Sequence, residues 1–170
     1  MFHLHSRRLD VVLEPGQFFF GESDLRIGTL LGSCVAITMW HPRTKAGGMC
    51  HYLLPSRGQP RPDEQLPDGR YGDEALEMFM QEIERIHTFR EDYQVKLFGG
   101  GSQFQFDAQA GPIDVPTLNI RAGTRLLAGH GLQAQAEHVG GSGSRQVVLD
   151  LANGHVWVRH RRLVHPGVGR

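Results

Sequence analysis

A long apolar segment followed by a turn constrains the fold of this chain more than any other feature. Residues 29–40 (TLLGSCVAITMW) are rich in β-branched and aromatic side chains, which predicts a strand that begins near Cys34. We expect this strand to lie inside a sheet that is covered on both sides, because both of its faces are mostly apolar. One face would carry Val35, Ile37 and Met39, and the other Ala36, Thr38 and Trp40.

The following residues predict the partner of that strand. Residues 41–46 (HPRTKA) have the composition of a turn, and residues 47–54 (GGMCHYLL) predict a returning antiparallel strand. In such a hairpin Cys34 lies roughly across from residues 51–54, which brings its thiol near the His51 imidazole. The register stays open at this point, since a slip of one residue reverses the faces.

The rest of the pattern mixes helices and strands without a repeated unit. We expect a helix capped by Asp73 that runs to residues 85–87, a helix over 119–128, and strands over 94–98, 132–138, 147–151 and 155–159. The last two strands flank Asn153-Gly154, a strong hairpin turn signal. This order predicts an α/β fold of the α+β kind: a layered α/β sandwich of mixed or antiparallel sheets flanked by helices.

The 170 residues are expected to form a single domain, 1–170, with three less regular parts. Residues 1–26 are predicted to be irregular, with a turn at Pro15-Gly16. Residues 55–70 hold four of the nine prolines and no apolar run, so they predict a long loop, which serves either as a lid or substrate rim or as a plain surface insertion. Residues 160–170 predict a flexible basic tail.

Composition excludes several classes of function. The 18 basic and 18 acidic residues balance, so the chain lacks the basic excess typical of proteins that bind nucleic acid. No apolar run approaches the roughly 20 residues of a membrane-spanning helix, and residues 1–10 lack the apolar region of a secretory signal. We therefore expect a cytoplasmic protein without membrane insertion, and nothing in the sequence demands more than a monomer.

The two cysteines are expected to be free, because a lone disulfide is rare where cytosolic thiols are kept reduced. Cys34, Cys50 and His51 also fall short of the four ligands of a structural zinc site, so no metal is predicted. Cys50 directly precedes His51 and on a strand points to the opposite face, which indicates a core residue.

Cys34 is the candidate nucleophile. Gly32 and Ser33 precede it, so the backbone there can approach a substrate closely and turn amides toward a developing oxyanion. His51 would hold the thiolate and then protonate the leaving group, which is the chemistry of covalent acyl transfer. By residue type alone, a small core residue and a structural histidine are the commoner roles for such a pair.

Two paired motifs add a family resemblance. LGSCVA over 31–36 and GGMCHYLLP over 47–55, in this order and spacing, resemble the signature of the CheD family of chemoreceptor glutamine deamidases. The likeness continues at Tyr71, at 98–101, at Asn119-Ile120 and at 140–145, and so covers about residues 28–159.

The resemblance implies a cysteine hydrolase that needs no cofactor. Members of the family convert glutamine side chains of chemoreceptors, the methyl-accepting chemotaxis proteins, to glutamate, and some also hydrolyse glutamyl methyl esters there. The catalytic cysteine and histidine of the family correspond to Cys34 and His51. Gly32, Ser33, Gly99 and Gly100 are the candidates for contacts with the substrate and its oxyanion.

Two positions depart from the family pattern. A catalytic threonine is expected six positions before the cysteine, where this chain has Gly28, and Thr29 is therefore taken as the third catalytic candidate. Pro116 replaces a glycine that the family tends to have three residues before Asn119, which predicts an altered entry into the second helix.

The resemblance also implies partners and alternatives. The implied substrates are cytoplasmic helices of chemoreceptors, and a CheC-type phosphatase is a further partner. A competing hypothesis is a non-catalytic adaptor that binds receptors or a CheC-type phosphatase without using the thiol. A third is a cysteine amidase that acts on glutamine in a different protein.

Overall fold

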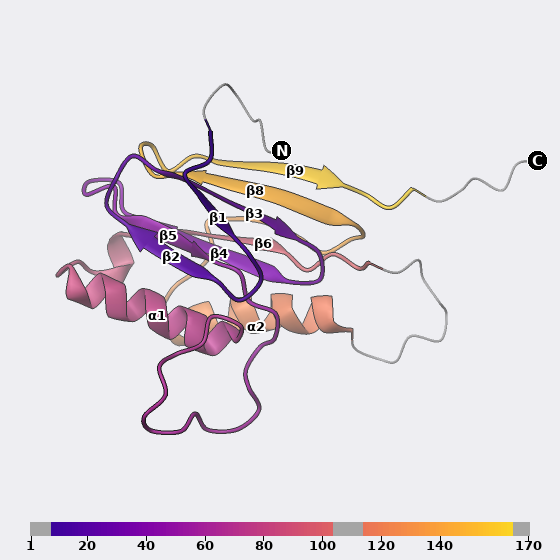
Figure 1. The fold of residues 1–170 in the computed structure, drawn as a ribbon, viewed down its shortest axis with the longest axis horizontal. Coiled ribbons are helices and arrows are strands. Elements are labelled where there is room, and N and C mark those ends of the chain that lie inside the picture. The colour runs from indigo at the N-terminus through magenta and orange to yellow at the C-terminus, as the bar shows by residue number, and fades with distance from the viewer. Residues whose placement is uncertain (1–7, 104–113, 165–170) are drawn as a thin grey trace, which may run out of the picture.

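The computed structural model describes residues 8–103 and 114–164, which form two stacked sheets and a layer of helices (Figure 1). The first sheet has the order β1-β3-β8-β9 and consists of β1 (Val11–Leu13), β3 (Arg26–Leu31), β8 (Ser144–Asp150) and β9 (Val156–Arg161). The second sheet has the order β2-β5-β4-β6-β7 and consists of β2 (Phe18–Gly21), β5 (Gly47–Cys50), β4 (Val35–Trp40), β6 (Gln94–Gly99) and β7 (Ala136–Val139).

Both α-helices of the described residues cover the outer face of the second sheet. They are α1 (Gly72–Arg85) and α2 (Val115–Gly129), and a short 3-10 helix, η1, spans Arg90–Asp92. Each sheet is mixed, since β1 pairs parallel with β3 and β7 parallel with β6 while the other pairs are antiparallel. The predicted α+β sandwich of mixed sheets is confirmed, with the refinement that the helices flank one of its two sides.

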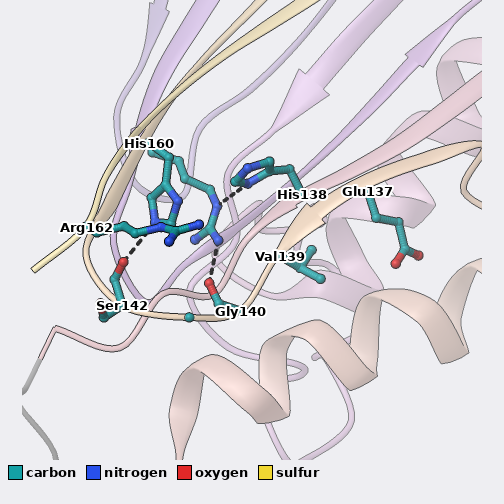
Figure 2. A pocket seen from close by; sticks show the side chains of 9 residues that line it. Glu137, His138, Val139, Gly140, Ser142, His160 and Arg162 are labelled. Carbon is teal, nitrogen blue, oxygen red and sulfur yellow. Dashed lines mark hydrogen bonds between the residues drawn. The ribbon is translucent and has the colours of Figure 1, made fainter.

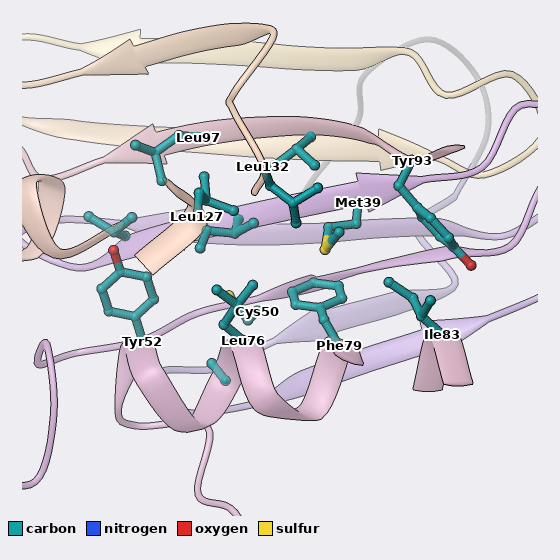
Figure 3. Packing of buried hydrophobic residues seen from close by; sticks show 14 residues of the cluster. Met39, Cys50, Tyr52, Leu76, Phe79, Ile83, Tyr93, Leu97, Leu127 and Leu132 are labelled. Carbon is teal, nitrogen blue, oxygen red and sulfur yellow. The ribbon is translucent and has the colours of Figure 1, made fainter. Parts of the chain in front are cut away.

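Strand β4 separates two hydrophobic cores because both of its faces are apolar. All six of its residues are buried. Val35, Ile37 and Met39 belong to the core beneath the helices, where side chains of α1 meet those of the sheet (Figure 3). Ala36 and Trp40 belong to the core between the two sheets. The prediction of a strand covered on both sides is therefore confirmed.

The N-terminal segment is more ordered than predicted. The described part of residues 1–26 contains β1 and β2, so the expectation of an irregular segment is wrong there. β1 pairs with β3, and β2 pairs with β5 from Phe18 opposite Cys50 onward. Strands of three and four residues carry too little periodicity to be recognised locally, and pairing with distant partners orders them. The turn at Pro15-Gly16 is present, with Gly16 at φ 84°.

The two helices begin earlier than predicted. Tyr71 rather than Asp73 occupies the N-cap of α1, because the Gly72 N–H already donates to the Leu54 carbonyl at 2.8 Å as the chain enters the helix. α2 begins at Val115 rather than 119, because the Asp114 carboxylate accepts a hydrogen bond from the Thr117 N–H at 3.1 Å. Pro116 lies in the first turn of α2, where its missing N–H costs nothing.

The predicted loop over 55–70 contains no helix or strand. The predicted basic tail is wrong for residues 160–161, which belong to β9, because pairing with β8 extends the terminal hairpin as far as Ser144 opposite Arg161. Residues 165–170 of that tail lie outside the described residues. Neither α-helix of the described chain is long and apolar enough to cross a membrane.

Candidate active site

The hairpin of β4 and β5 places Cys34 and His51 on one face of the second sheet. The pairing continues beyond β5, where the Val35 N–H donates to the Tyr52 carbonyl at 3.1 Å and the Tyr52 N–H to the Val35 carbonyl at 2.9 Å. With Val35 opposite Tyr52, the preceding residues Cys34 and His51 are diagonal neighbours that face the first sheet. The structure thus resolves the register that the sequence leaves open.

Thr29 approaches His51 from the opposing sheet. Ile27, Thr29 and Leu31 alternate along β3 and are fully buried toward the second sheet. Gly28 faces the other way, where a Cβ would come 2.6 Å from the Leu9 side chain. The structure therefore brings Thr29, and not Gly28, next to the histidine, with Oγ1 2.7 Å from His51 Nδ1.

The hydrogen bonds of Thr29 define the tautomer of His51. Thr29 Oγ1 also donates to the Leu13 carbonyl at 2.7 Å, and a hydroxyl has one proton to give. Oγ1 must then accept from His51 Nδ1–H, which leaves a lone pair on Nε2. Nε2 is buried and has no hydrogen-bond partner among the described residues.

Burial keeps this imidazole neutral. His51 is 1% exposed, and removal from water lowers its pKa to about 4. At neutral pH the ring is therefore uncharged, with its basic nitrogen unoccupied on the face that it shares with Cys34. This is the state required of a general base.

Cys34 is half-buried in the connection between β3 and β4. Burial raises the pKa of its thiol, and the Ser33 hydroxyl opposes that shift. A neutral thiol beside a neutral imidazole is thus favoured over the thiolate that the sequence hypothesis assumed. If this thiol is the nucleophile, its proton leaves during attack rather than before it.

Cys50 occupies a different environment. Its side chain is fully buried in the core beneath the helices, and burial raises its pKa to about 12. Both cysteines are free. The expectation that Cys50 is a core residue is confirmed.

Backbone amides near the thiol are available to a ligand. Within the described part of the chain, neither the Ser33 N–H nor the Cys34 N–H donates to a protein acceptor. The Gly100 N–H is occupied, because it donates to the Cys34 carbonyl at 2.8 Å, and a Cβ on Gly99 would come 2.4 Å from the same oxygen. Gly99 and Gly100 therefore shape the backbone of residues 32–34 between β3 and β4, which we call the nucleophile loop because it holds the candidate Cys34. The Gly32 carbonyl is held in turn by the Gly101 N–H at 2.9 Å.

Asn119 is a site residue whose contacts the sequence reasoning missed. Its Nδ2 donates to the Leu53 carbonyl at 2.7 Å and to the Ser33 carbonyl at 3.3 Å. It thereby ties α2 to the chain before Cys34 and to the chain after His51. The one signal in the sequence is a polar residue on the apolar side of a helix, and Asn119 is fully buried there.

The described residues offer no site for a metal ion, since no three histidine, cysteine or acidic side chains among them converge. Cys50 and His51 point to opposite faces of their strand, which separates two of the ligands considered from sequence.

Comparison with known proteins identifies relatives of this chain. A family model described as CheD chemotactic sensory transduction matches residues 53–160, a range that starts after both Cys34 and His51. A protein of Pseudomonas syringae pv. tomato, named probable chemoreceptor glutamine deamidase CheD, is 47% identical over 156 residues, which cover 90% of each chain. One from Pseudomonas fluorescens with the same name is 48% identical over 153 residues, 89% of this chain and 85% of the relative.

A third relative, probable chemoreceptor glutamine deamidase CheD 3 of Dechloromonas aromatica, is 47% identical over 153 residues, 88% of this chain and 86% of its own. Among solved structures, the Bacillus licheniformis hypothetical protein YfiH aligns with 71% of this chain and 49% of its own at a TM-score of 0.43 and 12% identity, which is too distant to carry an argument. The family model and the near full-length relatives indicate the same family that the two motifs over 31–36 and 47–55 resemble, and this chain belongs to the CheD family.

Proposed function

We propose that this chain is a protein-glutamine deamidase of bacterial chemoreceptors, with Cys34 as the nucleophile and His51 as the general base and acid. Relatives of 47–48% identity carry the name chemoreceptor glutamine deamidase. The observation that supports the residue roles is the buried, unpartnered Nε2 of His51, whose Nδ1 is held 2.7 Å from Thr29 Oγ1 on the face that Cys34 shares. The chain would act in the cytoplasm, on the cytoplasmic helices of the receptors.

The first half of the reaction is acylation. Cys34 Sγ attacks the carboxamide carbon of the substrate glutamine while His51 Nε2 takes the thiol proton. The N–H groups of Ser33 and Cys34 donate to the oxyanion of the tetrahedral intermediate. His51 returns the proton to the nitrogen, the C–N bond breaks, ammonia leaves, and a thioester remains on Cys34.

The second half is hydrolysis. A water molecule attacks the thioester carbon and gives a proton to His51 Nε2. The C–S bond then breaks, glutamate leaves, and the proton on His51 returns to the sulfur. A glutamyl methyl ester would follow the same steps with methanol in place of ammonia, so both reactions are proposed for the site. Every step uses side chains and backbone of this chain, and no cofactor enters it.

Thr29 orients the base in this proposal. Because its hydroxyl proton is committed to the Leu13 carbonyl, Thr29 can only accept from Nδ1–H, and this fixes the lone pair on Nε2. The same contact stabilises the imidazolium that forms during each proton transfer.

Mass spectrometry of a glutamine-bearing receptor fragment tests the proposal. Incubated with wild type in ¹⁸O-labelled water, defined glutamines should become glutamates that carry one heavy oxygen. Cys34→Ala should convert none, and Cys50→Ala, the matched cysteine control, should retain the activity. Receptor binding that survives Cys34→Ala, with no conversion by wild type, would overturn the deamidase and favour the adaptor.

The remaining partners are proposals of the same kind. A CheC-type phosphatase would be a second binding partner, and the chain would act as a monomer. Size-exclusion chromatography with light scattering, with and without such a phosphatase, measures both. A dimer of the chain alone would contradict the proposed monomer.

A further inference from the structure

A second polar site lies where β7, the glycine loop 140–143 and the ends of β8 and β9 meet, and Cys34 is not among its lining residues. A cavity of about 620 Å³ opens there and is lined by His138, Arg145, His160 and Arg162 among others (Figure 2). The proposed deamidation uses none of these side chains. A role other than deamidation must therefore account for the presence of these four side chains at one cavity.

Arg145 places a buried positive charge in the wall of this cavity. The side chain is 2% exposed, although arginine is almost never buried without a counter-charge. Its Nε donates to His138 Nδ1 at 2.8 Å and its Nη2 donates to the Gly140 carbonyl. Nη1 is buried without a hydrogen-bond partner, and no carboxylate of the described residues forms an ion pair with this guanidinium.

Of the two histidines, His138 keeps a ring donor for a ligand, whereas His160 is already paired with the backbone. A guanidinium only donates, so His138 Nδ1 must accept from Arg145 and the ring proton lies on Nε2. The His138 ring is exposed, which leaves that N–H accessible. His160 Nε2 lies 2.8 Å from the Ser142 carbonyl, and the two rings meet edge to face with centroids 5.3 Å apart.

Positive charge dominates the cavity. Arg162 is exposed at its rim. Burial is the main cause that lowers the pKa of both His138 and Arg145, and the charge of Arg162 lowers both further. Glu137 is the one acidic residue of the lining. It forms no ion pair within the described chain, and Figure 2 shows its carboxylate on the far side of Val139 from His160 and Arg162. A site with two arginines and the His138 Nε2–H donor is complementary to an anion.

We propose that this cavity binds an oxyanion, a carboxylate or a phosphate group, through His138 Nε2–H and the Arg162 guanidinium, with Arg145 as the fixed charge behind them. The oxyanion would neutralise a buried cation that the described chain leaves without a counter-ion. The proposal does not rest on the proposed deamidation, because neither Cys34 nor His51 lines this cavity.

The competing explanation is that Arg145 only holds the glycine loop in place. Its bond to Gly140 fits that role, but the role requires neither Arg162 nor an accessible His138 Nε2–H. Substitution of Arg162 therefore separates the two, and because Arg162 is exposed, its variant is expected to fold.

NMR of the histidine side chains tests the site without any turnover. Wild type labelled with ¹⁵N is titrated at fixed pH and ionic strength with inorganic phosphate, and separately with a short peptide amide that contains one glutamate. Arg162→Gln is the test variant and Arg125→Gln, on the exposed side of α2, is the matched control. Cys34→Ala is titrated alongside, so that loss of deamidation and loss of anion binding are told apart.

We expect a saturable shift of the His138 ring in wild type, Cys34→Ala and Arg125→Gln. Arg162→Gln should bind about tenfold more weakly or worse, as loss of one charge-assisted hydrogen bond predicts. Tighter binding of phosphate would identify a free anion as the ligand, and tighter binding of the peptide a side-chain carboxylate. The absence of a saturable shift with both probes, or equal weakening in Arg125→Gln, would overturn the proposal.

Discussion

At the scale of single residues, the site depends on where two protons lie. Thr29 gives its hydroxyl proton to Leu13 and so receives the Nδ1 proton of His51. Burial then keeps the Cys34 thiol protonated and the His51 imidazole neutral. The proposed nucleophile is therefore activated by proton transfer during attack, and not by a preformed ion pair.

Removal of the Thr29 hydroxyl tests this orientation. We expect Thr29→Val to lower kcat about 10- to 100-fold with little change in KM, because a hydrogen bond to a group that becomes charged is worth roughly 1.5–3 kcal/mol. Thr29→Ser keeps the hydroxyl and should retain most of the rate. Steady-state deamidation kinetics measure both variants, and equal losses in Val and Ser would contradict an orienting role.

Alkylation of Cys34 reports the state of the thiol. Burial holds its pKa above 9.0, so the rate with iodoacetamide should still be rising at that pH, because the thiolate is the reacting species. His51, with a pKa of about 4, is neutral over this range and cannot hold a thiolate as an imidazolium. The experiment uses the Cys50→Ala variant, in which Cys34 is the one remaining cysteine, so that all alkylation is that of Cys34. A rate plateau near neutral pH that vanishes in His51→Gln would contradict this prediction.

At the scale of elements, ion pairs fasten the loop over 55–70 to α1. Glu74 accepts from Arg57 at 2.6 and 2.9 Å and from the Asp68 N–H at 2.8 Å, and its side chain is 7% exposed. Glu77 pairs with Arg61 at 2.8 Å but is 40% exposed. The loop is therefore attached at a buried point and at an exposed point, which differ in strength.

Substitution at these two points distinguishes them. Glu74→Gln should lower the free energy of unfolding by about 1–3 kcal/mol, because buried donors lose a charged acceptor. Trypsin should then cleave the native protein faster within 55–70. Glu77→Gln is the matched control, with an expected loss below about 1 kcal/mol. Thermal unfolding and timed proteolysis measure both, and equal effects would contradict the difference in burial.

At the scale of the whole molecule, the second sheet contributes side chains to both hydrophobic cores, one on each of its faces. Leu97 packs beneath the helices and Leu149 packs between the sheets, and both are buried. Loss of either core removes support from the same five strands. The candidate pair, Cys34 just before β4 and His51 just after β5, therefore depends on a sheet that the helices support.

Truncation of each core should unfold the molecule as one unit. We expect Leu97→Ala and Leu149→Ala each to cost about 2–5 kcal/mol, the usual range for a buried leucine. Near-ultraviolet and far-ultraviolet circular dichroism should follow a single coincident transition in both variants. Separate transitions in either variant would show that the two cores unfold independently.

The features that the sequence determined by itself are local patterns and the two motifs. The doubly apolar β4, the proline-rich loop and the terminal hairpin at Asn153-Gly154 are visible because each pattern lies within about a dozen residues. The motifs around Cys34 and His51 also identified the family. Their pairing followed from one turn, since a hairpin brings its own two strands together.

Only the tertiary structure decided what depends on distant segments. β1 and β2 are too short to be predicted, and exist through pairing with β3 and β5. Thr29 meets His51 because the two sheets stack, and Asn119 reaches the nucleophile loop because α2 packs on the second sheet. The cavity at Arg145 likewise forms only where residues 137–145 meet residues 160–162. Such contacts form between residues far apart in the chain, and no local periodicity encodes them.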